Sequence, residues 1–326
     1  MSATRLNLLL IVGLAGAMAL SLIAGKVWLP IDPFVGFGQG DDPRWLIIAE
    51  LRAPRTLLAL ILGAGLGLSG AAMQGFLRNP LADPGLFGVS SGASLGAVLS
   101  LYFGFAGFPL VLPAFALSGA VMTMLALALL AGRSGSLILF ALAGIILSSV
   151  TGSMTALAIS LAPTPFAVSE IITWLMGALT DRSWNDVWLA LPLTLLGAGL
   201  IALTARALDV LTLGEPAARS MGVDLARMQW LIIVGVGLCV GAAVASAGVI
   251  GFVGLMVPHM VRRVVGGRPS ATLLPSALGG ALLLLLADTL VRALPTVSEL
   301  RLGIAMSMLG GPFFLWLLFS LRRQLP

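Results

Sequence analysis

The sequence predicts an all-α fold, a polytopic membrane protein of about ten transmembrane helices. Of its 326 residues, 59% are hydrophobic and only 10% are charged, whereas soluble domains carry about 25% charged residues. The mean hydropathy is +1.09, and many apolar runs approach the ~20 residues that a helix needs to cross a bilayer. These runs are continuous, whereas a transmembrane β-barrel would alternate polar and apolar residues.

Ten apolar segments define the predicted helices, and no low-complexity linker divides them, so residues 1–326 are expected to form one transmembrane domain. A signal peptide is the alternative for the first segment, but no small-residue cleavage site follows a short apolar region. The eighth segment is short and interrupted by glycines. The segments are 6–29, 56–75, 86–104, 109–131, 137–161, 186–206, 228–247, 249–265, 271–291 and 300–320.

The charges between these segments predict the orientation of the chain in the membrane. If the N-terminus is cytoplasmic, eleven Lys and Arg residues lie inside and seven lie outside. This excess follows the positive-inside rule, so both termini are predicted to be cytoplasmic. The sequence pI of about 10.9 therefore reflects topology, and no nucleic-acid partner is expected, because the basic residues form no patch on a soluble face.

Scarce residue types exclude several kinds of site. With one His and one Cys, the chain can form neither an internal disulfide nor a His/Cys metal cluster. Its single lysine, Lys26, lies in Ala-Gly-Lys-Val, whereas a phosphate-binding Walker A loop requires Gly-Lys-Ser/Thr. No catalytic residue, cofactor or metal site is predicted, and if ATP drives transport, another chain must bind the nucleotide.

Two motifs follow the second segment. Residues 78–85 are dense in turn-forming Asn, Pro, Asp and Gly and predict a cytoplasmic loop. Residues 88–92, Gly-Val-Ser-Ser-Gly, match the nucleophile pattern of serine hydrolases, which here would need His259 as the base and a strand–turn–helix context. Because the motif opens an apolar helix instead, Ser90 or Ser91 is expected to cap that helix.

Three glycines three residues apart, Gly248, Gly251 and Gly254, open the eighth segment. On a helix this spacing would leave one face nearly bare, and another backbone or a transported molecule could approach it closely. We assign these glycines, together with Ser90 and Ser91, to a translocation path or to helix packing.

Charged residues lie at the ends of two predicted spans. Arg52 and Arg55 flank Pro54 just before the second span, where long side chains often anchor a helix at the interface. Asp288 and Arg292 are four residues apart, so they could pair on one helix face.

The longest predicted cytoplasmic connection is the segment 207–227, which contains a short helix signal. Glu215 and Pro216 suit the first turn of a helix, and Gly222 suits its end. An inert connector is the alternative interpretation.

Taken together, several strings resemble the permease family of ABC importers for iron-siderophores, haem and vitamin B12. They occur in the family's order, are specific as a set, and span residues 50 to 320. One departure is Pro216, where the family more often has another residue. The matching strings are Leu51-Arg-Ala-Pro-Arg-Thr56, Ser69-Gly-Ala-Ala-Met-Gln74, Asn79-Pro-Leu-Ala-Asp-Pro84, Gly88-Val-Ser-Ser-Gly92, Leu213-Gly-Glu-Pro-Ala-Ala218, Gly251-Phe-Val-Gly-Leu-Met-Val-Pro-His259 and Leu286-Ala-Asp288.

The resemblance implies a multi-pass permease in the bacterial inner membrane, in contact with lipid. It would act as a dimer with a second copy of itself, driven by two cytoplasmic ATPase subunits and supplied by a periplasmic substrate-binding protein. The substrate class is a metal chelate: a ferric-siderophore, haem or cobalamin.

The resemblance also suggests roles for particular residues. Arg52, Arg55 and Arg292 resemble the arginines that dock the binding protein. The residues resembling the helix that couples to the ATPase are Gly214, Glu215, Ala217, Ala218, Arg219 and Gly222.

A secondary transporter or channel that does not use ATP is the alternative function. Such a protein usually needs carboxylates or histidines within the membrane for ion coupling. No carboxylate lies near the middle of a predicted span.

Overall fold

The computed structural model describes residues 3–29, 43–105, 108, 110–132 and 136–322, and within these ranges the secondary structure is helical, with no strand. Seven helical runs in this part of the chain are long and apolar enough to cross a membrane. They are Ala3–Ile23 (α1), Arg44–Phe76 (which runs through α3, η1 and α4), Val111–Ala131 (α6), Leu137–Ser160 (α7), Trp184–Leu203 (α9), Leu225–Ala247 (α12) and Pro269–Ala293 (α14).

Further helices complete the described chain. Three of them coincide with predicted segments: Val89–Tyr102 (α5), Val253–Val264 (α13) and Leu302–Arg322 (α15). The others are Pro84–Phe87 (η2, a 3₁₀ turn), Pro165–Leu175 (α8), Ala205–Leu211 (α10) and Glu215–Ser220 (α11). The all-α, multi-span prediction is confirmed, while the count of ten crossings stays a prediction.

One predicted helix boundary is wrong, and one helix lies outside the predicted segments. The second segment begins near residue 43 instead of 56, because α3 (Pro43–Leu46) and a π-helical turn (Ile47–Arg52, η1) continue directly into α4 (Ala53–Phe76). The helix α8 lies between the predicted segments 137–161 and 186–206, although its start carries a recognisable signal. The Thr164 hydroxyl accepts the Ala167 N–H at 3.2 Å, and Pro165 occupies the first turn, as capping predicts.

Glycines bring the central helices into backbone contact. A Cβ added at Gly63 or Gly67 of α4 would collide with the backbone of α14, and one added at Gly70 would collide with Gly254 of α13. Close approach through small residues is a common way for helices to associate in lipid. As a result, α4 is buried along almost its whole length and forms the axis of the bundle.

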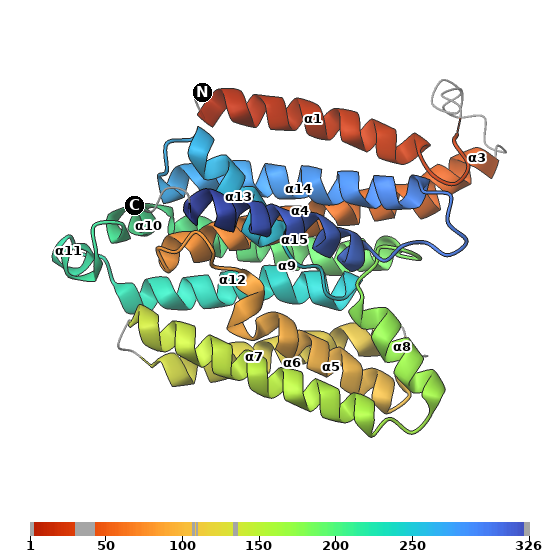
Figure 1. Ribbon diagram of the computed structural model, residues 1–326, viewed down its shortest axis with the longest axis horizontal. Helices are drawn as coiled ribbons and strands as arrows, with labels where there is room; N and C mark the ends of the chain where they lie inside the picture. The colour runs from red at the N-terminus through yellow and green to blue at the C-terminus, as the bar shows by residue number, and fades with distance from the viewer. Residues whose placement is uncertain (1–2, 30–42, 106–107, 109, 133–135, 323–326) are drawn as a thin grey trace.

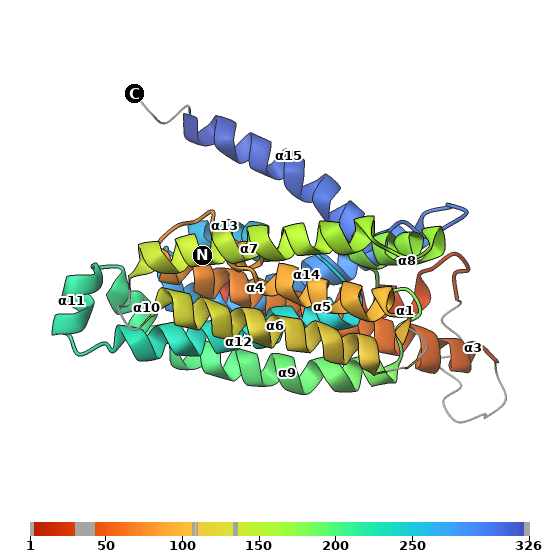
Figure 2. The same cartoon turned by 90° about the horizontal axis from the view of Figure 1, so that it is seen from below.

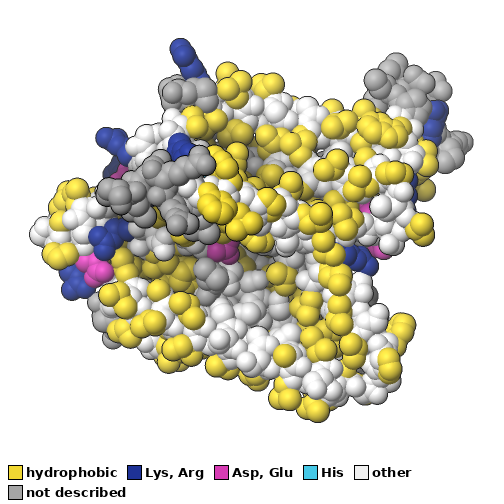
Figure 3. All heavy atoms as spheres, viewed as in Figure 1, with side chains coloured by type: hydrophobic (Ala, Val, Ile, Leu, Met, Phe, Trp, Pro, Cys, Tyr) yellow, Lys and Arg dark blue, Asp and Glu magenta, His cyan; other side chains and the backbone are white. Residues whose placement is uncertain are grey.

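The long helices lie roughly parallel to the longest axis of the molecule (Figure 1). The start of α1 and the last turn of α15 lie at the end that carries α10 and α11, and α3 and α8 lie at the other end. Most of the charged side chains on the face in Figure 3 gather towards these two ends, with hydrophobic side chains between them. The helix α15 leans away from the rest of the bundle (Figure 2).

Candidate functional site

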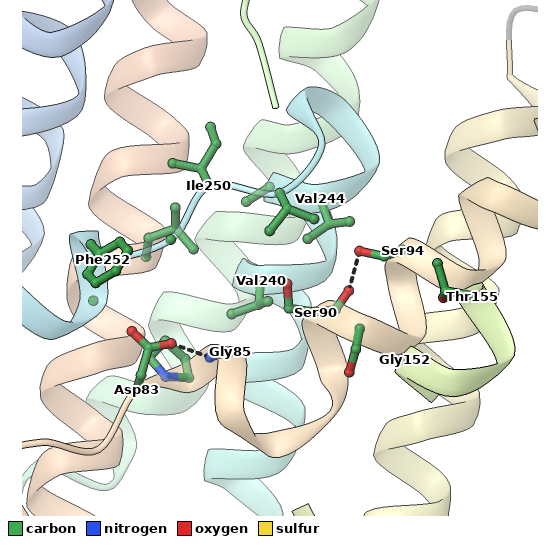
Figure 4. Close-up of a pocket in the computed structure, with 17 residues that line it drawn as sticks. Asp83, Gly85, Ser90, Ser94, Gly152, Thr155, Val240, Val244, Ile250 and Phe252 are labelled. Carbon is green, nitrogen blue, oxygen red and sulfur yellow. Dashed lines mark hydrogen bonds between the residues drawn. The ribbon is translucent and has the colours of Figure 1, made fainter. Parts of the chain in front are cut away.

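A cavity of about 330 Å³ lies in the middle of the bundle, and it contains four of the predicted site residues, Ser90, Ser91, Gly251 and Gly254. Its walls come from the turn before α5, from α5, α7 and α12, and from the connection between α12 and α13 (Figure 4). The lining residues are Leu66, Asp83, Pro84, Gly85, Ser90, Ser91, Ser94, Gly152, Thr155, Val240, Ala243, Val244, Val249, Ile250, Gly251, Phe252 and Gly254.

Hydroxyl groups from α5 and α7 give one wall of this cavity a polar surface. Ser94 donates to the Ser90 carbonyl at 2.8 Å, and Ser91 donates to the Gly88 carbonyl at 3.1 Å. Thr155 donates to the Thr151 carbonyl at 2.9 Å. These bonds satisfy the hydroxyl protons within each helix, so the wall presents oxygen atoms without an unpaired buried donor.

On the opposite side, the cavity contains a carboxylate. Asp83 accepts the Gly85 N–H at 2.7 Å and caps the 3₁₀ turn η2. Asp83 lies in the connection between α4 and η2, where burial raises the pKa of its carboxyl, and the bond from Gly85 only partly opposes this rise. From the sequence, residues 78–85 were expected to form a cytoplasmic loop, and Asp83 was not placed in a cavity.

The expected capping role of Ser90 or Ser91 is wrong, because α5 begins at Val89 and its N-cap is Gly88, with φ +82°. A 3₁₀ turn and not a strand precedes the motif, so the strand–turn–helix context of a serine hydrolase is missing here. His259 does not line the cavity.

The three spaced glycines do not share one helix face. The chain is non-helical from Gly248 to Phe252, and α13 begins at Val253. Gly248 (φ +73°) makes the turn out of α12 beside the Trp174 carbonyl, and Gly254 packs against α4 and Pro84. Around Gly251 there is open space, with no heavy atom within 4 Å of an added Cβ. Of the three, therefore, two serve packing and one borders the cavity freely.

Arg55 lies at the α3–α8 end of the bundle, inside a buried ion-pair network. Its Nε and Nη2 donate to Asp288 of α14 at 3.0 and 2.8 Å, and Nη2 donates to Glu299 at 2.5 Å. The Thr180 hydroxyl also donates to Glu299, at 3.0 Å. Burial favours a higher pKa for Glu299, but the bonds and charge of Arg55 and the bond from Thr180 hold the pKa below its ordinary value.

The other two predicted docking arginines also have partners within the chain. Arg52 donates to the carbonyls of Leu22 and Val27 at 2.9 and 2.7 Å. Arg292 donates to the carbonyl and hydroxyl of Ser21 at 2.6 and 2.9 Å.

Arg52, Arg55 and Arg292 are each only 8% exposed. The expected Asp288–Arg292 pair on one helix face is replaced by the Asp288–Arg55 pair between helices. Docking by these arginines stays a prediction, now made for side chains that also hold the α3–α8 end of the bundle together.

At the opposite end, α11 has the predicted form. Gly214 (φ +103°) precedes the helix, and Gly222 (φ +82°) follows it. The N–H groups of Gly222 and Val223 bond to the carbonyls of Arg219 and Ala218 at 3.0 Å each, which is the paired pattern of a Schellman cap.

The side chains of α11 and its flanks divide into an inner and an outer set. Ala218 is fully buried against the chain's own core, so its methyl group cannot be a surface contact. Leu213 and Met221 are exposed apolar residues. Asp209, which sequence reasoning missed, ties α10 to the start of α14 through the backbone N–H and hydroxyl of Ser270 at 2.9 and 2.6 Å.

Comparisons with known proteins agree with this architecture. Residues 9–320 match the FecCD transport family. The chain is 38% identical to the vitamin B12 import system permease protein BtuC of Citrobacter koseri, over 94% of this chain and 92% of that protein. It is 37% identical to the hemin transport system permease protein HmuU of Yersinia pestis, over 98% and 94%. Among solved structures, a metal-chelate type ABC transporter in an inward-facing conformation superposes with a TM-score of 0.88 and 31% identity, over 97% of this chain and 99% of that one.

Proposed function

The chain belongs to the FecCD transport family, and from this premise we propose that it is the transmembrane permease subunit of an ATP-driven importer for a metal chelate. The observation that carries the proposal is the match over nearly the whole chain to permeases named for vitamin B12 and hemin. The substrate class is a ferric-siderophore, haem or a cobalamin.

The proposed membrane topology has ten crossings. The helices α5, α13 and α15 would complete the set of crossings together with the seven runs named above, in one domain covering residues 1–326. Because α11, the start of α1 and the end of α15 share one end of the molecule, this end would face the cytoplasm, as the distribution of Lys and Arg also favours.

The proposed partners divide between the two ends. Cytoplasmic ATPase subunits would bind at the segment 207–227, where α11 presents Met221 to solvent. A periplasmic binding protein would deliver substrate near the Arg55 network, and a second copy of the chain would complete the transport path. ATP binding would then bias the equilibrium between inward-open and outward-open states.

The fixed charges favour this proposal over an ion-coupled secondary transporter. Asp288 is fully buried, but its carboxylate is bound by Arg55. A coupling carboxylate must exchange its ion or proton during transport, whereas this one is neutralised by a permanent charge.

The test is uptake by proteoliposomes that contain the permease, its ATPase and its binding protein. Cyanocobalamin, hemin and a ferric-siderophore would be compared, with and without ATP. ATP-dependent accumulation of one of these chelates is expected, and a catalytically inactive ATPase variant is the control. Uptake that follows an ion gradient and ignores ATP would support the secondary transporter instead.

A further inference from the structure

Two cavities meet at the segment 248–252. Besides the central cavity, an apolar groove of about 610 Å³ lies between the end of α8 and the first turns of α15. Only Val249, Gly251 and Phe252 line both spaces. Phe252 has the largest side chain of the three, and Figure 4 shows its ring on the opposite side of the central cavity from Thr155.

The backbone of Phe252 is held in an unfavourable conformation. Its φ of +68° and ψ of −22° lie in the left-handed region, which residues with a Cβ rarely occupy unless the surrounding structure imposes it. The preceding residue, Gly251, has open space around it, and Gly248 makes the turn that begins the segment. The segment 248–252 is therefore strained at Phe252 and unrestrained at Gly251, so it has room to change conformation.

The helix α15 holds the ring of Phe252 in place. The rings of Phe252 and Phe314 lie 6.0 Å apart. Gly310, one turn earlier on the same face of α15, lies directly against the Phe252 ring, and an added Cβ there would collide with it. The preceding residue, Phe313, lies beside His259, with ring centroids 6.1 Å apart, and packs edge-on against Phe314 at 5.5 Å. Because α15 leans away from the bundle (Figure 2), the position of the Phe252 ring depends on a helix with few other supports.

We propose that Phe252 is the barrier between the central cavity and the groove beneath α15, and that displacement of α15 releases the ring and joins the two spaces into one passage. The proposal rests on the transport function proposed above. It adds a specific closing residue and the helix that controls it.

Thiol accessibility tests the barrier without requiring transport. The only cysteine, Cys239, is buried and is replaced by alanine to give a thiol-free background. Ser90→Cys then reports on the central cavity, and Ser307→Cys reports on the groove. A membrane-impermeant charged maleimide is added from the groove side to vesicles of known orientation, and the rate of modification is measured.

Phe252→Ala is expected to raise the modification rate of Ser90→Cys at least tenfold and to leave that of Ser307→Cys unchanged. Phe252→Leu should keep the slow rate, because leucine retains most of the bulk of the side chain. Phe252→Gly should match Phe252→Ala, because the barrier is the ring itself and not the strained backbone of residue 252. Phe313→Ala is the matched control and should have a much smaller effect, because its ring packs on His259 and on Phe314. Gly310→Ala should act like Phe252→Ala by pushing the ring aside.

Equal rates for Ser90→Cys with phenylalanine and alanine at position 252 would overturn the proposal, as would an effect of Phe313→Ala as large as that of Phe252→Ala. If Phe252→Ala does not fold, as judged by gel filtration, the result with Gly310→Ala decides in the same way. Since modification needs no ATPase, failure here would leave the importer function untouched, and failure of uptake would leave the barrier result standing.

Discussion

Replacing Asp288 with asparagine is expected to lower the free energy of unfolding of the permease by about 3 kcal/mol. The wild-type carboxylate is fully buried and accepts bonds from Nε and Nη2 of Arg55. Asparagine keeps the shape but removes the charge, so the Arg55 guanidinium is left with one carboxylate. Losing one partner of a buried pair costs about 3–5 kcal/mol, and the remaining bonds to Glu299 place this case at the lower end.

Glu299→Gln provides a graded comparison. The Glu299 side chain is 16% exposed, so water compensates part of the loss, and the cost is expected to be about 1 kcal/mol. Changing all three members of the network, as Arg55→Met with Asp288→Leu and Glu299→Gln, should recover most of the stability, since well-packed apolar residues often replace a buried ion pair at little cost. Glu299 is included because Arg55 is also its cation.

The assay is thermal unfolding of the purified permease in detergent, with Glu50→Gln as the exposed-carboxylate control. With about 2 °C per kcal/mol for a chain of this size, the midpoint should fall by about 6 °C for Asp288→Asn and by about 2 °C for Glu299→Gln. A midpoint for Asp288→Asn equal to that of the control would refute the reasoning. Arg55 would then be bound too weakly to hold the helices together.

Three further predictions follow from the structure. Gly70→Ala should lower the unfolding midpoint by several degrees, because overpacking a core costs about 1–3 kcal/mol. Gly199→Ala should not lower it, because the space around Gly199 is open. Equal midpoints for the two variants would contradict the close backbone contact between Gly70 and Gly254. Met221→Glu should leave the midpoint unchanged but reduce copurification of the ATPase, whereas Ala218→Glu should destabilise the permease itself; normal assembly of Met221→Glu would place the coupling contact elsewhere. The pKa of Glu299 is lowered in the folded state, so the stabilisation by its carboxylate is present above the unfolded-state pKa and is lost as the pH falls through the folded-state pKa. Acidification below about pH 4.3 should therefore lower the unfolding midpoint less in Glu299→Gln than in wild type.

The long helices could be predicted from hydropathy because lipid requires uninterrupted apolar runs and internal backbone hydrogen bonds. Residues 43–55 escaped this reasoning, since Arg52 and Arg55 were interpreted as anchors at the membrane interface just before the span. Their partners explain the difference: Arg55 bonds to carboxylates 233 and 244 residues further along the chain. Arg52 bonds to one carbonyl in the last turn of α1 and to one just after it. No local pattern reveals such distant partners, so burial of these charges was out of reach from the sequence.

The short helix α11 could be predicted in detail because its signals are local. Pro216 near its start and Gly222 after its end constrain the backbone of their own segment. The direction of each side chain was not predictable, because it depends on which face packs against the rest of the chain. Ala218 thus proved to be an inward-facing residue, and the exposed Met221 replaces it as the residue by which coupling can be tested.

The spaced glycines show that one sequence motif can serve both helix packing and a cavity wall. Helix packing and a translocation path were open alternatives for Gly248, Gly251 and Gly254, and a spacing of three cannot separate them while the segment is assumed to be helical. The deciding variable is the backbone angle: φ is positive at Gly248 and at Phe252, so the helix cannot start before Val253. Once the helix is interrupted there, Gly254 is left to pack against α4, and Gly251 borders the cavity beside the one aromatic ring that closes it.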